Sequence, residues 1–123
     1  MKDIAYQRKL QALLGKEVEG SINRPLGSRH PKYHEMVYPI NYGYIDGFMA
    51  PDGMEQDVYV IGTDKPIHRF KGTVIAIIER EDDIEDKLVV SLNGNDYSAE
   101  EIEKLINFQE RYFKHKIIRR GDL

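Results

Sequence analysis

The sequence contains no cysteine, so disulfide bonds and metal centres held by thiolates are excluded. No apolar run approaches the roughly 20 residues that span a membrane, and the first six residues lack the apolar core of a secretory signal. Glycine-rich phosphate loops, a serine-nucleophile elbow and a dinucleotide fingerprint are absent as well. These absences predict a cytoplasmic protein with no membrane partner, and they leave serine-based catalysis without support.

The composition is that of one globular domain. The chain has 123 residues, which is long enough for one hydrophobic core but too short for two ordinary domains. It is 41% hydrophobic and 32% charged, as is usual for a globular protein. The formal net charge of −3 argues against nucleic acid as the main partner, although it leaves room for a local basic patch. The oligomeric state stays open, and a homo-oligomer is one of the alternatives.

Hydrophobic periodicity predicts two helices and several short strands. Apolar residues at helical spacing predict a helix over residues 3–14, which Gly15 ends. Ser98 and Glu101 form a capping box at the start of a helix over residues 99–113. Alternating or continuous apolar residues predict extended segments at residues 18–22, 37–45, 57–62, 72–78 and 88–92.

This order of elements predicts an α+β domain in which short strands pack with one long C-terminal helix. Several short strands in so small a chain tend to close into a barrel, because closure removes exposed strand edges. The basic tail, residues 114–120, is assigned to neither a helix nor a strand.

Two groups of acidic residues are candidates for metal binding. Asp52 lies on a turn and Asp57 opens a strand five residues later, and carboxylates of this kind suit Mg²⁺. An Asp-Gly turn followed by a strand-capping aspartate is the simpler alternative. The second group, residues 81–86, contains Asp82 and Glu85 and is followed by Lys87, which could hold a phosphate beside them. Its simpler alternative is a solvated hairpin tip.

Basic and phenolic side chains are candidates for phosphate binding. Arg24 and Arg29 belong to a basic loop, and arginine is the preferred bidentate phosphate ligand. Its alternative is an exposed loop. Tyr38 and Tyr42 stand in a tyrosine-rich segment whose hydroxyls can donate hydrogen bonds to phosphate oxygens. The four histidines show no metal-ligand spacing, so a zinc site is not expected.

The order of these pieces resembles the soluble, Mg²⁺-dependent inorganic pyrophosphatases over residues 22–114. The most specific match is Tyr38-Pro39-Ile40-Asn41-Tyr42-Gly43-Tyr44-Ile45, which is similar almost letter for letter. Asp52-Gly53-Met54-Glu55-Gln56-Asp57-Val58 matches at its first and last aspartates. Weaker matches are Ile22-Asn23-Arg24, residues 72–90, and Phe108-Gln109-Glu110-Arg111-Tyr112.

The resemblance implies a single pyrophosphatase-like domain over residues 1–123, with a small closed or partly open five-stranded barrel (OB-like) and flanking helices. It implies Mg²⁺ as the cofactor and attack of a metal-activated water on pyrophosphate or a related phosphoanhydride. The metal ligands would be Asp52, Asp57, Asp82 and Glu85. The substrate contacts would be Arg24, Arg29, Tyr38, Lys87 and Tyr112. The catalytic set would be Tyr42, Glu55 and Asp57.

Four positions depart from the family pattern, and one of them is Glu85, which replaces an aspartate and moves the carboxylate by one methylene. Met54 stands where the family carries the aspartate that serves as general base, and a thioether cannot accept that proton. Arg80 stands where a further metal-binding aspartate is expected, and Phe113 where a phosphate-binding lysine is expected. An inserted loop, residues 27–35, offers substitute phosphate ligands or a different specificity. The alternative to an enzyme is therefore a catalytically impaired module that binds phosphate, pyrophosphate or a nucleotide, or else a structural barrel with protein partners.

Overall fold

The computed structural model describes residues 2–123. Within them, neither helix is long and apolar enough to cross a membrane. In chain order the elements are α1 Ile4–Leu13, β1 Glu17–Arg24, β2 Asn41–Met49, β3 Glu55–Ile61, β4 Arg69–Arg80, β5 Lys87–Ser91, α2 Ala99–Glu110, β6 His115–Arg119 and the 3-10 turn η1 Arg120–Asp122.

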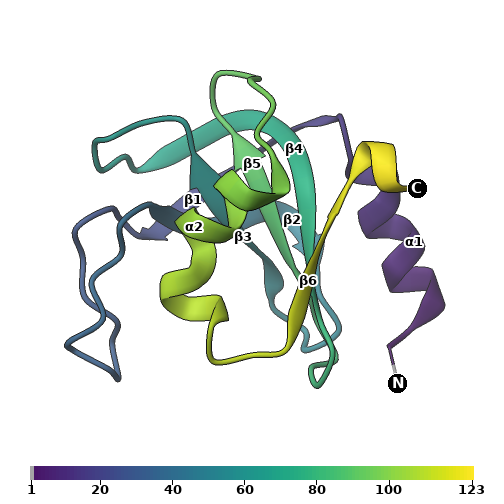
Figure 1. Ribbon diagram of the computed structural model, residues 1–123, viewed down its shortest axis with the longest axis horizontal. Helices are drawn as coiled ribbons and strands as arrows, with labels where there is room; N and C mark the ends of the chain where they lie inside the picture. The colour runs from purple at the N-terminus through teal and green to yellow at the C-terminus, as the bar shows by residue number, and fades with distance from the viewer. Residues whose placement is uncertain (1) are drawn as a thin grey trace.

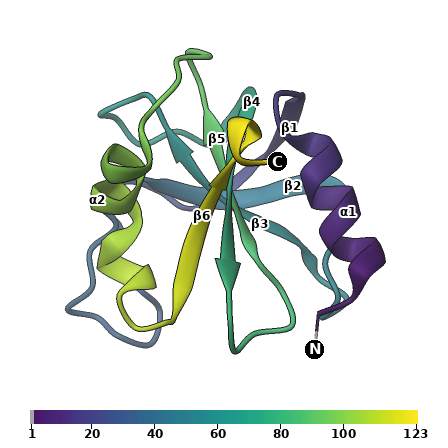
Figure 2. The ribbon, with the colours of Figure 1, turned by 45° about the vertical axis from the view of Figure 1, so that its right-hand side comes forward.

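Five of the strands close into a barrel. They pair in the order β1, β2, β3, β5, β4, and β1 also pairs with β4, which completes the ring. The β3–β5 pair is parallel, whereas the other pairs in the ring are antiparallel. Figures 1 and 2 show α1 and α2 on opposite sides of the barrel, with β6 running along its outside against β4. The prediction of an α+β domain with a five-stranded barrel and two helices is confirmed.

Two glycines allow β1 and β2 to approach closely where β1 pairs with both of its neighbours. A Cβ on Gly20 would lie 1.9 Å from the carbonyl oxygen of Tyr44. A Cβ on Gly43 would lie 2.0 Å from the carbonyl oxygen of Ser21. Any side chain at these positions would push the two backbones apart, so the tight curvature of the barrel depends on glycine here.

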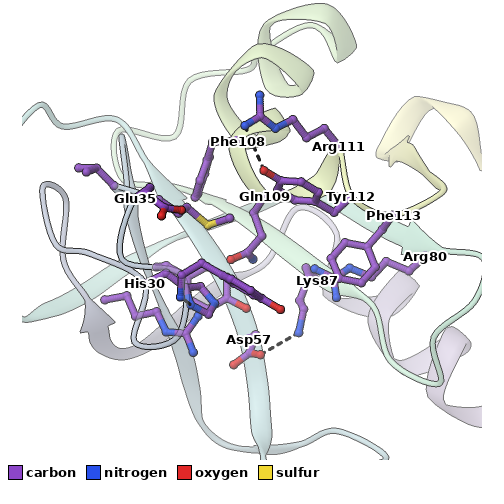
Figure 3. Close-up of a pocket in the computed structure, with 15 residues that line it drawn as sticks. His30, Glu35, Asp57, Arg80, Lys87, Phe108, Gln109, Arg111, Tyr112 and Phe113 are labelled. Carbon is purple, nitrogen blue, oxygen red and sulfur yellow. Dashed lines mark hydrogen bonds and ion pairs between the residues drawn. The ribbon is translucent and has the colours of Figure 1, made fainter.

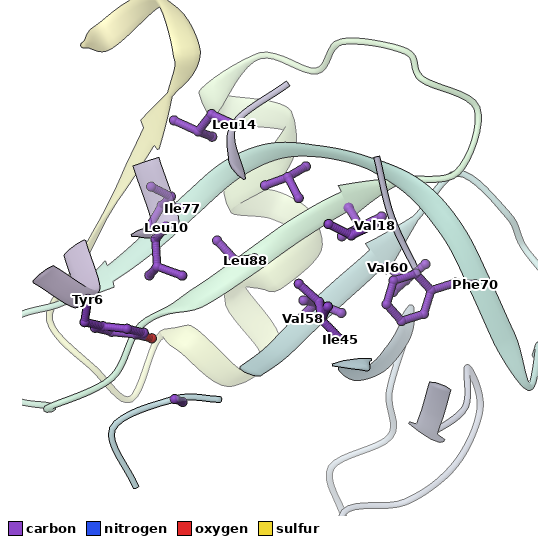
Figure 4. Close-up of a cluster of buried hydrophobic side chains, with 13 residues drawn as sticks. Tyr6, Leu10, Leu14, Val18, Ile45, Val58, Val60, Phe70, Ile77 and Leu88 are labelled. Atoms are coloured by element: carbon purple, nitrogen blue, oxygen red, sulfur yellow. The ribbon is translucent and has the colours of Figure 1, made fainter. Parts of the chain in front are cut away.

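The strands bury one apolar cluster on each of their faces. Because successive residues of a strand point to opposite faces, Val58 and Val60 of β3 join the inner cluster, while Tyr59 and Ile61 join the outer one. The inner cluster takes residues from all five barrel strands, and α1 packs against it (Figure 4). The outer cluster lies beneath α2. The cavity described below forms beside this outer cluster.

The helix ends follow the local signals in the sequence. Asp3 caps α1 by accepting a hydrogen bond from the backbone N–H of Ala5 (2.8 Å). Ser98 accepts one from the backbone of Glu101 (3.1 Å), and the Glu101 carboxylate accepts one from the backbone of Ser98 (2.9 Å). Gly15, just after α1, has φ of +84°. The predicted capping box and glycine stop are confirmed.

The end of α2 and the basic tail differ from the prediction. The helix stops at Glu110 and not at Phe113, and the chain turns so that the Phe113 ring packs on the Arg80 guanidinium, 3.7 Å from ring centroid to Cζ. The tail then forms β6, in which Ile117 and Ile118 pair with β4. Two adjacent isoleucines in a basic segment show no hydrophobic periodicity that would indicate a strand. This strand is therefore determined by its pairing with β4 and not by local sequence.

Candidate active site

A cavity of about 990 Å³ lies beside the barrel, between the β1–β2 loop (residues 25–40) and the C-terminal end of α2. Figure 3 shows His30 and Glu35 of the loop on one side, Arg111 and Tyr112 on the other, and strand residues below. The strands supply Arg24, Tyr42, Asp57, Arg80 and Lys87. The fold therefore brings together charged residues that are far apart in the sequence.

On the floor of the cavity, Lys87 holds two carboxylates together. Its Nζ lies 2.8 Å from Asp57 Oδ2 and 3.1 Å from Glu85 Oε1. Asp57 and Lys87 meet because β3 and β5 run side by side in parallel. Burial by itself lowers the pKa of Lys87. The neighbouring Tyr42 and Asp57 have the larger, opposite effect, so the pKa of Lys87 lies above its usual value. Lys87 is a permanent cation at neutral pH.

Arg24 and Tyr42 form the wall next to this floor. The guanidinium of Arg24 stacks near the rings of Tyr42 and Tyr38, 5.5 Å and 5.7 Å from their centroids. Burial raises the pKa of Tyr42, so its phenol stays protonated and can donate a hydrogen bond. Arg24 and Lys87 thus give one cavity two positive charges and a phenol donor, which are the groups that bind phosphate oxygens.

A chain of buried hydrogen bonds runs from Arg24 into α2. Arg24 Nη1 donates to the Tyr38 hydroxyl (2.6 Å), which donates to Gln109 Oε1 (2.9 Å). The Gln109 amide then donates to the Tyr59 hydroxyl (2.8 Å). Because these side chains are hydrogen-bonded in series, the position of Arg24 depends on the position of α2.

The same chain continues to Arg80 through a buried ion pair. The Tyr59 hydroxyl donates to Glu110 Oε2 (2.6 Å), and Glu110 accepts from Arg80 through Nη2 (2.6 Å) and Nε (3.0 Å). Glu110 is fully buried and Arg80 nearly so. Arg80 Nη1 also reaches Asp83 at 3.3 Å. Two arginines on the cavity wall are therefore joined by one continuous network, which we call the arginine relay: Arg24, Tyr38, Gln109, Tyr59, Glu110 and Arg80.

Asp57 on the floor and Glu85, which shares Lys87 with it, fit a hydrated divalent cation. Glu85 Oε2 is buried and has no hydrogen-bond partner among residues 2–123. Burial raises the pKa of Glu85, and the nearby Asp52 adds to this effect, so a cation would stabilise the charged form. No group of three or more acidic or histidine side chains is arranged as a complete metal cage in the described chain. Mg²⁺ commonly needs only one or two carboxylates, with water and phosphate as the other ligands.

Six of the residues predicted for the site, Asp52 and Glu85 among them, lie outside the cavity lining. Tyr38 is fully buried and takes part in the relay. Glu55 accepts a hydrogen bond from a backbone N–H of β2 (2.7 Å), and Arg29 donates to a carbonyl of its own loop (2.9 Å). Asp82 is exposed at the tip of the β4–β5 hairpin. The roles assigned to these residues stay predictions.

Several cavity residues were not in the predicted set. Gln109, Arg111 and Arg80 line the cavity, as does His30 of the inserted loop. The sequence indicates Arg80 only as a departure from the family pattern and not as a site residue. Glu110, which holds Arg80, lies in a segment that matches the family but has no predicted role, because a buried ion pair between a strand and a helix leaves no spacing rule in the sequence.

The fold and the cavity together define a class of protein. A closed five-stranded barrel carries, beside one wall, a site lined by four cationic side chains, Arg24, Arg80, Lys87 and Arg111, and by the carboxylates of Asp57 and Glu35. Such a site is suited to a phosphate-type anion together with a divalent cation.

Comparison of this chain with known proteins shows which family it belongs to. The family model for inorganic pyrophosphatase matches residues 17–118, which is most of the chain. The chain belongs to the inorganic pyrophosphatase family. This membership supports metal-dependent hydrolysis of pyrophosphate as its reaction and pyrophosphate as its substrate.

Solved structures of the same fold include three bacterial inorganic pyrophosphatases. That of Ehrlichia chaffeensis is 16% identical, with a TM-score of 0.67, and the match covers 88% of each chain. That of Coxiella burnetii is 18% identical, with a TM-score of 0.64 and coverage of 86% of this chain and 88% of the other. That of Neisseria gonorrhoeae is 22% identical, with a TM-score of 0.58 and coverage of 83% and 75%. No curated protein sequence matches the chain.

Proposed function

We propose that the cavity binds inorganic pyrophosphate or a related phosphoanhydride and that its floor supports Mg²⁺-dependent hydrolysis by a metal-activated water, in the cytoplasm. The observation that carries the proposal is the meeting of Asp57 and Lys87 at 2.8 Å on the floor of a cavity that Arg24 and Tyr42 also line. Arg24 and Lys87 would bind the phosphoryl oxygens. Tyr42 would donate a hydrogen bond beside the attacked phosphorus, and Tyr112 would contact the substrate from the rim.

Asp52, Asp57 and Glu85 are the residues that would hold the cation. The buried, unpartnered oxygen of Glu85 supports this assignment. When bound, the metal ion supplies a water of lowered pKa and neutralises phosphate charge. Asp57 would also orient Lys87, because its carboxylate already holds the ammonium toward the cavity.

The first test is phosphate release from pyrophosphate with and without Mg²⁺. Asp57→Asn should lower the rate by about 100-fold, because the variant loses the charge that would hold the cation and that orients Lys87. Asp96→Asn is the matched control, since Asp96 is exposed and does not line the cavity, and it should keep the wild-type rate. Equal rates for wild type and Asp57→Asn would contradict the proposal.

A noncatalytic binding module is the second candidate, and the turn between β2 and β3 favours it. Met54, at the position where the family places a general base, is 67% exposed and offers no proton acceptor. Arg80, at the position of a further metal ligand, is already neutralised by Glu110. A protein of this kind would bind pyrophosphate through Arg24 and Lys87 without turning it over.

Met54→Asp separates the two candidates. If the site lacks only its base, the variant should raise the rate of pyrophosphate hydrolysis by about 100-fold or more. If the chain is a binding module, neither wild type nor variant should release phosphate. Calorimetry should then still detect pyrophosphate binding, and Lys87→Ala should weaken it.

A further inference from the structure

The cavity is much larger than its phosphate-binding floor requires. Its volume of about 990 Å³ lies at the top of the roughly 300–1,000 Å³ that is usual for pockets that bury drug-sized ligands. Inorganic pyrophosphate is only two phosphoryl groups that share one oxygen. Asp57 and Lys87 of the floor and Arg24 of the adjoining wall would hold it, and most of the remaining space would stay unused.

The remaining space is lined by aromatic and apolar side chains. Tyr33, Met36 and Val37 of the β1–β2 loop form one wall, and Phe108 and Tyr112 stand on the α2 side. Of the nine large apolar residues exposed in the described chain, four line this cavity: Tyr33, Val37, Tyr112 and Phe113. Exposed apolar groups that gather around one pocket are typical of a ligand site.

The backbone of the loop wall is held by hydrogen bonds within the loop. The loop is closed by backbone hydrogen bonds from His30 to Met36 (2.9 Å) and from Tyr38 to Ser28 (2.9 Å). His30 Nδ1 accepts hydrogen bonds from two backbone N–H groups, 3.0 Å and 3.1 Å away, and its ring lies 5.1 Å from that of Tyr33, centroid to centroid. The loop therefore presents the His30 ring, held by two hydrogen bonds, beside the half-exposed ring of Tyr33.

The opposite wall offers a flat pair as well. Arg111 Nη2 donates to the hydroxyl of Tyr112 (3.1 Å), and its guanidinium lies 5.2 Å from the Tyr112 ring centroid. Figure 3 shows this pair facing His30 across the cavity, above Asp57 and Lys87. Rings and guanidinium planes stack on nucleobases regardless of base identity, while Glu35 on the loop side of the cavity offers an acceptor for the edge of a base.

We infer that the substrate of this site is a nucleoside diphosphate, with its phosphates on the Arg24–Lys87 floor and its base between the β1–β2 loop and α2. This inference rests on the proposed function, because it assigns the organic part of the substrate of that same site. In the reaction, water adds to the terminal phosphorus and the bond from that phosphorus to the bridging oxygen breaks. The products are phosphate, nucleoside monophosphate and one proton.

The test measures binding and phosphate release with ADP, GDP, CDP, UDP and pyrophosphate, each with Mg²⁺. We expect at least one nucleoside diphosphate to bind about tenfold or more tightly than pyrophosphate, since one stacking contact is commonly worth between about 5-fold and 150-fold. Tyr33→Ala should lower the ratio of the two affinities by a factor in this range. Tyr33→Phe should restore the ratio, and Ile4→Ala, an exposed apolar residue outside the cavity, should leave it unchanged.

The outcomes separate this inference from the proposed function. If pyrophosphate is hydrolysed while all four nucleotides bind more weakly, the inference is overturned and the proposed function stands. The inference also falls if Tyr33→Ala leaves the affinity ratio unchanged. If a nucleotide binds in a Tyr33-dependent way but neither substrate releases phosphate, the ligand class is supported and hydrolysis is wrong.

Discussion

Replacing Glu110 by glutamine would test the buried ion pair through its charge alone. The amide keeps the size of the side chain, but it removes the negative charge that faces Arg80 at 2.6 Å and 3.0 Å. The guanidinium would then be buried with only Asp83 nearby, at 3.3 Å and partly exposed. Removing one partner of a buried pair typically costs about 3–5 kcal/mol. Because Glu110 also accepts the Tyr59 hydroxyl, we expect a loss of about 4 kcal/mol in the free energy of unfolding.

Urea denaturation would measure this loss. With a slope near 2 kcal/mol/M, in the middle of the range for small proteins, Glu110→Gln should lower the midpoint by about 2 M. Lys71→Ala is the control, because Lys71 pairs with Glu17 and Glu19 at 3.6 Å and 3.8 Å on the exposed surface. Exposed pairs contribute little, so the control should leave the midpoint unchanged.

A double variant would show whether the cost comes from an unpaired charge. Combining Glu110→Gln with Arg80→Met removes the guanidinium that the first change leaves without a partner. Apolar replacement of a buried pair is often neutral or stabilising, so the double variant should be more stable than Glu110→Gln alone. The reasoning is refuted if Glu110→Gln costs less than about 1 kcal/mol or if the effects of the two changes simply add.

Three further predictions concern the rest of the fold. Burial by itself lowers the pKa of His115. Its hydrogen bonds to the Phe113 carbonyl oxygen (2.8 Å from Nδ1) and to Glu103 Oε1 (2.7 Å from Nε2) have the larger, opposite effect and raise the pKa. Its stabilising effect should be complete below about pH 6.5 and disappear as pH rises through the raised value, so urea midpoints of wild type and His115→Gln should converge from pH 6 to pH 8. Gly43→Ala should cost about 3 kcal/mol or more in thermal unfolding, from the clash at 2.0 Å. Gly121→Ala, with nothing within 4 Å, should cost nothing measurable. Ser98→Ala, which removes the cap of α2, should cost about 1 kcal/mol by urea denaturation.

The features that could be predicted from the sequence are local ones. The capping box at Ser98 depends on residues three apart, and the glycine stop after α1 depends on a single residue. The strand over residues 72–78 is buried almost throughout, as its continuous apolar run indicates. Each of these signals lies within one element, so no knowledge of the partner strands is needed to find it.

The features that could not be predicted join distant parts of the chain. The substrate contact expected of Tyr38 stays a prediction, and its motif does not indicate that its hydroxyl bonds to Arg24 and Gln109 within the wall. The relay connects β1, the β1–β2 loop, β3, α2 and β4, and its members stand at unrelated spacings. The pair Arg80–Glu110 spans 30 residues, and no periodicity or propensity links two positions of this kind. Such contacts follow from tertiary packing alone.

The ion pair between Arg80 and Glu110 also limits how this site could change over evolutionary time. An aspartate introduced at position 80 alone would bury two carboxylates against each other without a cation, and that arrangement is strongly unfavourable. A chain of this kind would need to alter position 110 first, or both positions together, to acquire an acidic residue there. A single substitution at either position is therefore destabilising. Descendants of this sequence should keep or lose Arg80 and Glu110 as a pair.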